Sequence, residues 1–136
     1  MGVSLHTRAK SYELGAASFF ASWFSTIYVR LENDSWGVRF PAIMNELYSG
    51  SVAADRVAEA LRELKIIQTE FAGFCPDAIV WDYEDRTKQP PWGTNISPEI
   101  TSLANYFVTS NGKDLFRVMR GAFEEALRSA CAVTVQ

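Results

Sequence analysis

The chain has 136 residues, and its 13 Lys and Arg side chains against 16 Asp and Glu give a formal net charge of −3 at pH 7. Because 48% of the residues are hydrophobic and 13% are aromatic, an intrinsically disordered chain is excluded and one folded domain over residues 1–136 is expected. The isoelectric point near 5.1 argues against direct DNA or RNA binding, since nucleic-acid-binding domains normally present a basic face.

The first half of the chain predicts one strand followed by three helices. Residues 3–8 alternate between apolar and polar, which is typical of a half-buried strand. From Glu13 to about Leu31 apolar residues recur at helical spacing with a second apolar edge, so this helix should be central and covered on two sides. A second helix is predicted from Pro41 and a third over residues 52–71. The inner face of the second helix is expected to hold Ile43, Met44, Leu47 and Tyr48.

The second half predicts shorter elements. Residues 78–83 have the composition of a strand, and Ser97-Pro98 is a helix-start signal that predicts a short helix. Residues 106–109 then predict another strand, and the Asn-Gly turn that follows leads into a helix over about residues 114–130. Residues 133–135 suggest a terminal strand.

The order of these elements decides the fold class. The predicted order is strand, three helices, strand, short helix, strand, helix and strand. This alternation is too irregular for a doubly wound parallel sheet. We therefore expect an α+β fold, a single domain in which helices pack on one face of a small, mostly antiparallel sheet of three to four strands.

Targeting signals and disulfides are not expected. The first residues lack a basic region followed by an apolar run, so they do not resemble a signal peptide. The longest uncharged run, residues 14–29, is shorter than the roughly 18–20 residues that span a bilayer, and it is better explained as a buried helix. Cys75 and Cys131 are expected to be reduced thiols in a cytoplasmic protein.

Few residues are candidates for catalysis. His6 is the only histidine, and it is expected at the surface because no partner is identifiable on the polar side of its strand. Cys75 has no nearby cation or helix start to activate its thiol, so a buried structural role is expected for it, and Cys131 is expected in the core. No glycine-rich phosphate loop is present, and no cofactor is expected.

One segment carries the net charge. Between Cys75 and Glu99 five acids face two bases, whereas the charges of the remaining chain nearly cancel. Three interpretations stay open: a solvated loop, a divalent-metal site at Asp82, Glu84 and Asp85, or a protein-binding edge. In the last case aromatic anchors ringed by acids would suit a basic partner such as a nuclease.

Several blocks of the sequence resemble a known family. They are FFASWF at residues 19–24, WGVRFP at 36–41, PPWGTNISP at 90–98 and NYFVTSNGKDLF at 105–116. Together they resemble the Immunity protein 70 type of bacterial immunity proteins, which belong to polymorphic-toxin and contact-dependent growth inhibition systems. The resemblance implies a small cytoplasmic protein that is not an enzyme. It also implies a partner, the toxic C-terminal domain encoded beside it, whose activity the family does not fix.

The charge argument and the resemblance together give a predicted function. We expect an immunity protein that neutralises its cognate toxin domain, with no contact to nucleic acid or membrane. The expected contacts are Asp82, Tyr83, Glu84, Asp85 and Trp92. Two alternatives remain, a small ligand-binding or hydrolytic enzyme that uses His6 or Cys75, and a structural subunit of a larger assembly. The oligomeric state is left open.

Overall fold

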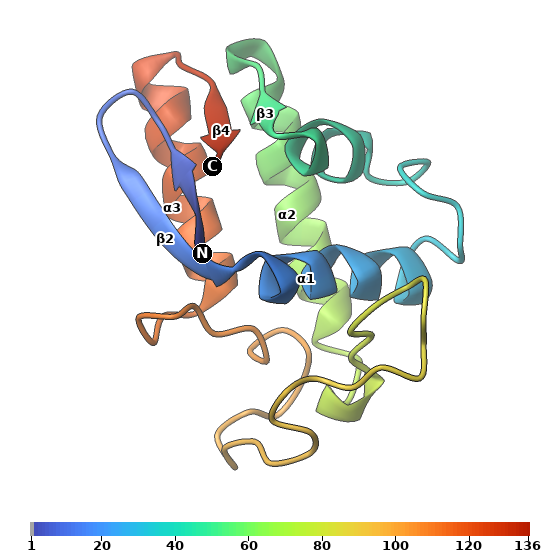
Figure 1. The fold of residues 1–136 in the computed structure, drawn as a ribbon. Helices are drawn as coiled ribbons and strands as arrows, with labels where there is room; N and C mark the ends of the chain where they lie inside the picture. Colours follow the sequence, from blue (N-terminus) through green and yellow to red (C-terminus); the bar gives the residue numbers. More distant parts are fainter. Residues whose placement is uncertain (1) are drawn as a thin grey trace.

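The protein has an α+β fold built on one antiparallel sheet, as the computed structural model of residues 2–136 shows (Figure 1). The strand order in the sheet is β2-β1-β4-β3. The strands are β1 (Gly2–His6), β2 (Ser11–Ala16), β3 (Ser51–Val52) and β4 (Val133–Val135). The helices are α1 (Ala17–Arg30), α2 (Val57–Phe71) and α3 (Leu115–Ser129), with a π-helical segment at Ala42–Leu47 and single 3₁₀ turns at Ala54–Arg56 and Pro76–Ala78. The predicted fold class is confirmed.

One face of the sheet forms a wall of the core. Leu5, Leu14, Val52 and Val133 come from the four different strands, and each is completely buried. Their neighbours along the strands, such as His6, point to the opposite face. In Figure 1, α2 and α3 lie behind the sheet and α1 crosses its lower end. The helices therefore cover the apolar face, as the alternation in residues 3–8 predicts.

The predicted start of the first helix is wrong. Residues 13–16 belong to β2, which pairs with β1 and has an irregular register opposite Val3 and Ser4. Gly15 has a φ of +136°, a conformation that L side chains rarely adopt, and it ends the helical pattern on its N-terminal side. The carbonyl of Leu14 accepts a hydrogen bond from the Ser110 backbone N–H, so it is used outside any helix.

From Ala17 onward α1 is the central element of the core. Its residues Phe19, Phe20, Trp23, Phe24 and Ile27 are buried, and so are the small polar residues between them. The Trp23 ring packs edge-on against Phe24 and against Phe116 of α3, with ring centroids 5.1 and 5.9 Å apart. The prediction of a helix covered on two sides is confirmed.

Residues 78–83 do not form the predicted strand, because α1 satisfies their backbone. The Val80 N–H donates to Thr26 Oγ1 at 3.1 Å, and the Tyr83 N–H donates to Ser25 Oγ at 3.2 Å. The Arg30 side chain donates to the Ala78 carbonyl at 2.8 Å. Side chains of α1 therefore hold this segment along the helix. The backbone groups that they bind are not available for pairing with another strand.

The predicted elements over residues 97–109 are also wrong. Ser97 does accept the Glu99 N–H, as a helix cap would, but the Asn105 side chain accepts the N–H groups of residues 101 and 102 and turns the chain. Residues 106–109 make one isolated bridge, between Val108 and Asp114, instead of a strand. Buried Leu103, Tyr106 and Phe107 anchor this irregular segment in the core.

The last two helices form near their predicted ranges. α2 begins at Val57 rather than at residue 52, because Ser51 and Val52 pair with β4. α3 begins after Asp114, whose side chain accepts the Phe116 N–H as an N-cap. The terminal strand predicted at residues 133–135 is confirmed as β4.

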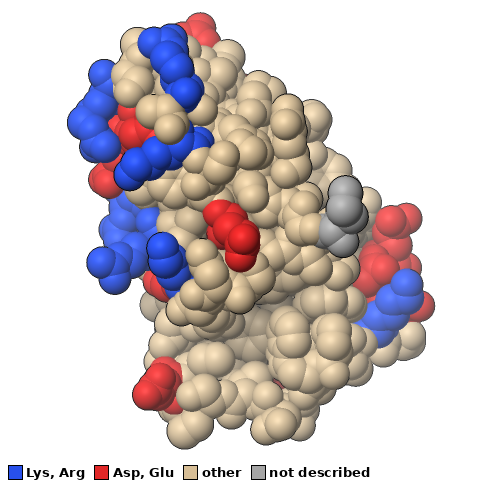
Figure 2. All heavy atoms as spheres, turned by 60° about the vertical axis from the view of Figure 1, so that its left-hand side comes forward, with Lys and Arg blue, Asp and Glu red and all other residues tan. Residues whose placement is uncertain are grey.

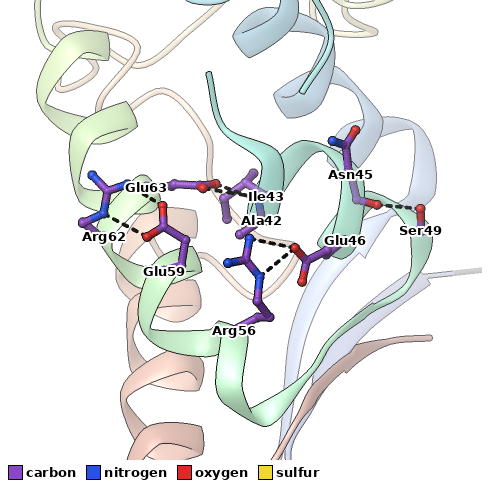
Figure 3. A network of polar contacts seen from close by, with 9 residues as sticks. All are labelled: Ala42, Ile43, Asn45, Glu46, Ser49, Arg56, Glu59, Arg62 and Glu63. Atoms are coloured by element: carbon purple, nitrogen blue, oxygen red, sulfur yellow. Dashed lines mark hydrogen bonds and ion pairs between the residues drawn. The ribbon is translucent and has the colours of Figure 1, made fainter. Parts of the chain in front are cut away.

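Two buried carboxylates stabilise the region between α1 and α2. Glu32 is 5% exposed, and its oxygens accept the backbone N–H groups of Gly37, Arg39 and Phe40. Glu63 is 1% exposed and accepts the N–H groups of Ala42 and Ile43 at 3.2 and 2.9 Å, at the start of the π-helical segment (Figure 3). Each acid therefore replaces hydrogen bonds that these turns cannot make for themselves.

Glu63 should make the stability depend on pH near neutrality. Burial raises the pKa of Glu63 from an ordinary 4.5 to about 7, and the neighbouring Glu59 adds to the rise. Between these two values the unfolded chain ionises first, so the free energy of unfolding should fall as pH rises, by about 3 kcal/mol at most. Glu63→Gln should remove this slope. Urea unfolding of the wild type and of Glu63→Gln at several pH values measures the free energy of unfolding. If this free energy changed with pH equally in both proteins between pH 4.5 and 7, Glu63 would not be the titrating group.

Candidate functional site

The acidic segment predicted as a binding edge forms an exposed turn that its own side chains hold. Asp82 Oδ1 accepts the Glu84 backbone N–H at 2.9 Å, and Lys88 lies 3.4 Å from the other oxygen. Asp85 Oδ1 accepts hydrogen bonds from the hydroxyl and the N–H of Thr87, which lower the pKa of Asp85. The turn therefore has a defined shape although it contains no helix or strand.

The charges in this turn are unevenly compensated. Both bases of the segment are engaged, since Lys88 pairs with Asp82 and Arg86 pairs with Asp34 at 2.6 Å. Among residues 2–136, no ion pair involves Glu84 or Asp85, and both side chains are exposed. The negative charge that a partner would meet is therefore concentrated at these two carboxylates.

Tyr83 joins this turn to a group of aromatic rings from other elements. Its ring centroid lies 5.1 Å from that of Tyr28 at the end of α1 and 5.2 Å from that of Trp36. Trp36 in turn contacts Tyr48 edge-on at 4.8 Å, and its N–H donates to the Met44 carbonyl at 2.9 Å. We call these four rings the Tyr83 cluster.

The Tyr83 cluster is accessible and borders the carboxylates. Tyr48 is 49% exposed, so its predicted place on the inner face of a helix is wrong, and the other three rings are partly exposed. Burial raises the pKa of the Tyr83 hydroxyl, and the nearby negative charge of Glu84 raises it further. The cluster, Asp82, Glu84 and Asp85 together form what we call the acidic aromatic surface.

The sequence analysis missed three members of this surface. Tyr28, Trp36 and Tyr48 lie far from residue 83 in the sequence, and helical spacing predicts Tyr48 on the inner face of a helix. One signal was available, because Tyr28 and Trp36 lie on either side of the polar residues Asn33 and Asp34, which are typical of a turn.

Trp92 belongs to a different aromatic group. Its ring packs edge-on against Trp81, with centroids 5.5 Å apart, and its N–H donates to the Tyr106 hydroxyl at 2.8 Å. Trp92 is 39% exposed and lines an apolar groove of about 220 Å³ with residues that include Phe19 and Ile96. In the strand predicted over residues 78–83, Trp81 and Tyr83 would lie on one face, but the structure gives them different aromatic partners.

The residues considered for catalysis are not assembled into a site. His6 Nδ1 lies 2.8 Å from the Ser11 hydroxyl, in an exposed pair on the outer face of the sheet. Cys75 is exposed, so the expectation that it is buried is wrong, because the chain leaves α2 at this point and turns over the surface. Cys131 is buried as predicted. No disulfide joins the two cysteines.

Residues 2–136 contain neither a cluster of metal-ligating side chains nor a helix that could span a membrane. Asp82, Glu84 and Asp85 are not such a cluster, because no three His, Cys, Asp or Glu side chains of the described chain are grouped closely enough to hold a metal ion. Within the same residues, each helix is too short or too polar to cross a bilayer.

Comparison with known proteins identifies the family. A search of curated proteins and a search of solved structures each found no significant match. A protein-family model described as Immunity protein 70 matches residues 5–135, which is nearly the whole chain and includes all four blocks noted in the sequence. Proteins of this kind bind toxins and are generally not enzymes. The chain therefore belongs to the Immunity protein 70 family.

Proposed function

We propose that residues 1–136 act as one immunity domain that binds the toxic C-terminal domain encoded beside it and neutralises that toxin. The toxin would belong to a polymorphic or contact-dependent growth inhibition system, and the protection would take place in the cytoplasm of the producing cell. The protein would act by binding alone, without catalysis or a cofactor. The family match over residues 5–135 carries this proposal.

The acidic aromatic surface is the proposed toxin contact. Glu84 and Asp85 supply uncompensated negative charge, which would speed the encounter with a basic toxin, such as a nuclease whose substrate is anionic. The partly exposed rings of the Tyr83 cluster supply area that becomes buried on binding, and Tyr and Trp are enriched where interface energy concentrates. Trp92 is proposed as a peripheral contact, since it packs in the separate group with Trp81.

A binding experiment tests the function directly. The tagged chain is incubated with the isolated toxic C-terminal domain, and the affinity is measured at low and moderate salt. We expect a stoichiometric complex with a Kd on the order of nanomolar or below, and an association rate that falls as salt rises. A folded toxin domain that forms no complex would reject the immunity function.

The enzymatic alternative gives the opposite expectation for two variants. His6→Ala and Cys75→Ala should each protect cells from the toxin as well as the wild type does, because neither side chain belongs to the acidic aromatic surface. Growth of toxin-expressing cells measures protection. Loss of protection in either variant, with wild-type stability and expression, would favour a role for that side chain in chemistry.

Light scattering of the chain alone tests the remaining alternative, a structural subunit, which would form a stable homo-oligomer.

A further inference from the structure

Eleven of the 13 Lys and Arg side chains fall into two groups, and Arg30 and Lys65 lie outside both. Five of them form ion pairs, namely Arg39, Arg56, Arg62, Arg86 and Lys88. Six others lie on α3, on the turn before it and on the turn between β1 and β2, and none of these forms an ion pair within residues 2–136. They are Arg8, Lys10, Lys113, Arg117, Arg120 and Arg128. Figure 2 shows Lys and Arg side chains gathered along one edge of this part of the molecule.

A groove lies within this basic face. It runs between β2 and the first turns of α3, has a volume of about 480 Å³, and is lined by residues that include Tyr12, Lys113 and Arg117. Val118 and Gly121 form part of its wall. The volume lies within the range of sites that accept ligands, and the lining combines two cations with apolar surface.

Gly121 is unexplained by the packing of the chain itself. It lies in the middle of α3, where glycine is less favourable than alanine because it loses more backbone entropy on folding. A Cβ atom at this position would meet no heavy atom within 4 Å, so no neighbour requires the glycine. Its effect is to leave an open notch in the helix wall of the groove.

We propose that this groove is a second docking surface, which binds an extended acidic segment of a protein partner. The unpaired Lys113 and Arg117 would contact its carboxylates, and its backbone would approach α3 closely at Gly121. A nucleic acid fits less well, because a duplex is rigid and longer than the groove and would also meet the rest of a chain whose net charge is −3, whereas a short peptide contacts the groove alone.

The proposal is tested with a defined probe and does not depend on the toxin. Amide chemical shifts of the ¹⁵N-labelled chain are recorded while a decaglutamate peptide is added at low salt. Shift changes should concentrate at residues 112–121 and at Tyr12, on both sides of the groove. Arg117→Glu should weaken binding about tenfold, since it replaces an attraction with a repulsion. Lys65→Glu, the same change at an exposed base of α2 without an ion pair, should leave the affinity unchanged.

Gly121→Ala separates docking from stability. The variant should melt about 3 °C higher than the wild type, because alanine is the better helix former, and should nevertheless bind the peptide several-fold more weakly. Equal weakening by Arg117→Glu and Lys65→Glu would reduce the effect to general charge attraction and overturn the proposal. It would also be overturned by unchanged binding in Gly121→Ala, by shift changes outside the groove, or by tighter binding of a DNA duplex there.

Discussion

Glu32→Ala should lower the free energy of unfolding by about 4 kcal/mol, a large share of the 5–15 kcal/mol typical of a small domain. The carboxylate accepts backbone N–H groups from Gly37, Arg39 and Phe40, at 3.0, 3.2 and 3.0 Å. Removing it leaves buried donors without acceptors, and each such donor costs about 1–3 kcal/mol. The loop between α1 and the π-helical segment has no other acceptor in place for them.

Two matched variants show whether the loss of stability in Glu32→Ala comes from the buried hydrogen bonds. Glu32→Gln keeps one acceptor oxygen and should lose about half as much stability as Glu32→Ala. Glu70→Ala removes a partly exposed ion pair with Arg39, in the same loop, and should cost less than about 1 kcal/mol. Urea unfolding monitored by circular dichroism gives all three values. If Glu32→Ala is as mild as Glu70→Ala, the carboxylate does not organise this loop.

Reversal of Asp82, Glu84 and Asp85 to lysine should weaken toxin binding at least about 100-fold. The change replaces three negative charges beside the Tyr83 cluster, two of them without an ion pair in the described chain, with positive charges that a basic toxin would repel. Most of the loss at low salt should appear in the association rate, because long-range attraction acts before the surfaces touch. Surface plasmon resonance at two salt concentrations measures both rates.

A single-residue pair controls for disruption of the turn. Asp82 accepts the Glu84 N–H, so the triple variant also alters the loop itself, whereas the side chain of Glu84 has no ion pair in the described chain. Glu84→Lys should therefore weaken binding without a change in stability, and Asp55→Lys, the same reversal at an exposed acid before α2, should leave binding unchanged. If the triple variant and the wild type bound the toxin with equal affinity, the toxin would contact another surface of the protein. The proposed immunity function would not be contradicted.

The elements that the sequence predicts correctly are those whose stability comes from a periodic apolar face. α1 from Ala17, α2 and α3 bury such faces, and β1 and β4 alternate as half-buried strands do. The strand predicted over residues 78–83 is wrong because polar side chains from a distant element bind its backbone. Ser25 and Thr26 of α1 take the N–H groups of residues 80 and 83, which no local pattern indicates.

Contacts between residues far apart in the sequence also limit the prediction of the candidate site. The charge excess identifies the 82–85 turn from composition alone, because charge can be counted along the chain. The rings around it come from α1, from the loop after α1 and from the end of the π-helical segment, so only the folded chain brings Tyr28, Trp36 and Tyr48 to Tyr83. Trp92 lies near this turn in sequence but packs against Trp81 and Tyr106 instead.

The strand order also determines how the protein folds. Leu5 pairs with Val135, so β1 and β4 come from opposite ends of the chain, and β4 in turn connects β3 to the sheet. Closing so long a loop is slow, because its entropy must be lost before the contacts form. The β1–β2 hairpin and the helices can form from local contacts, whereas the sheet is completed only when β4 inserts. Folding should therefore be slower than in a helical bundle of the same length, and the last step should be the closure of the sheet.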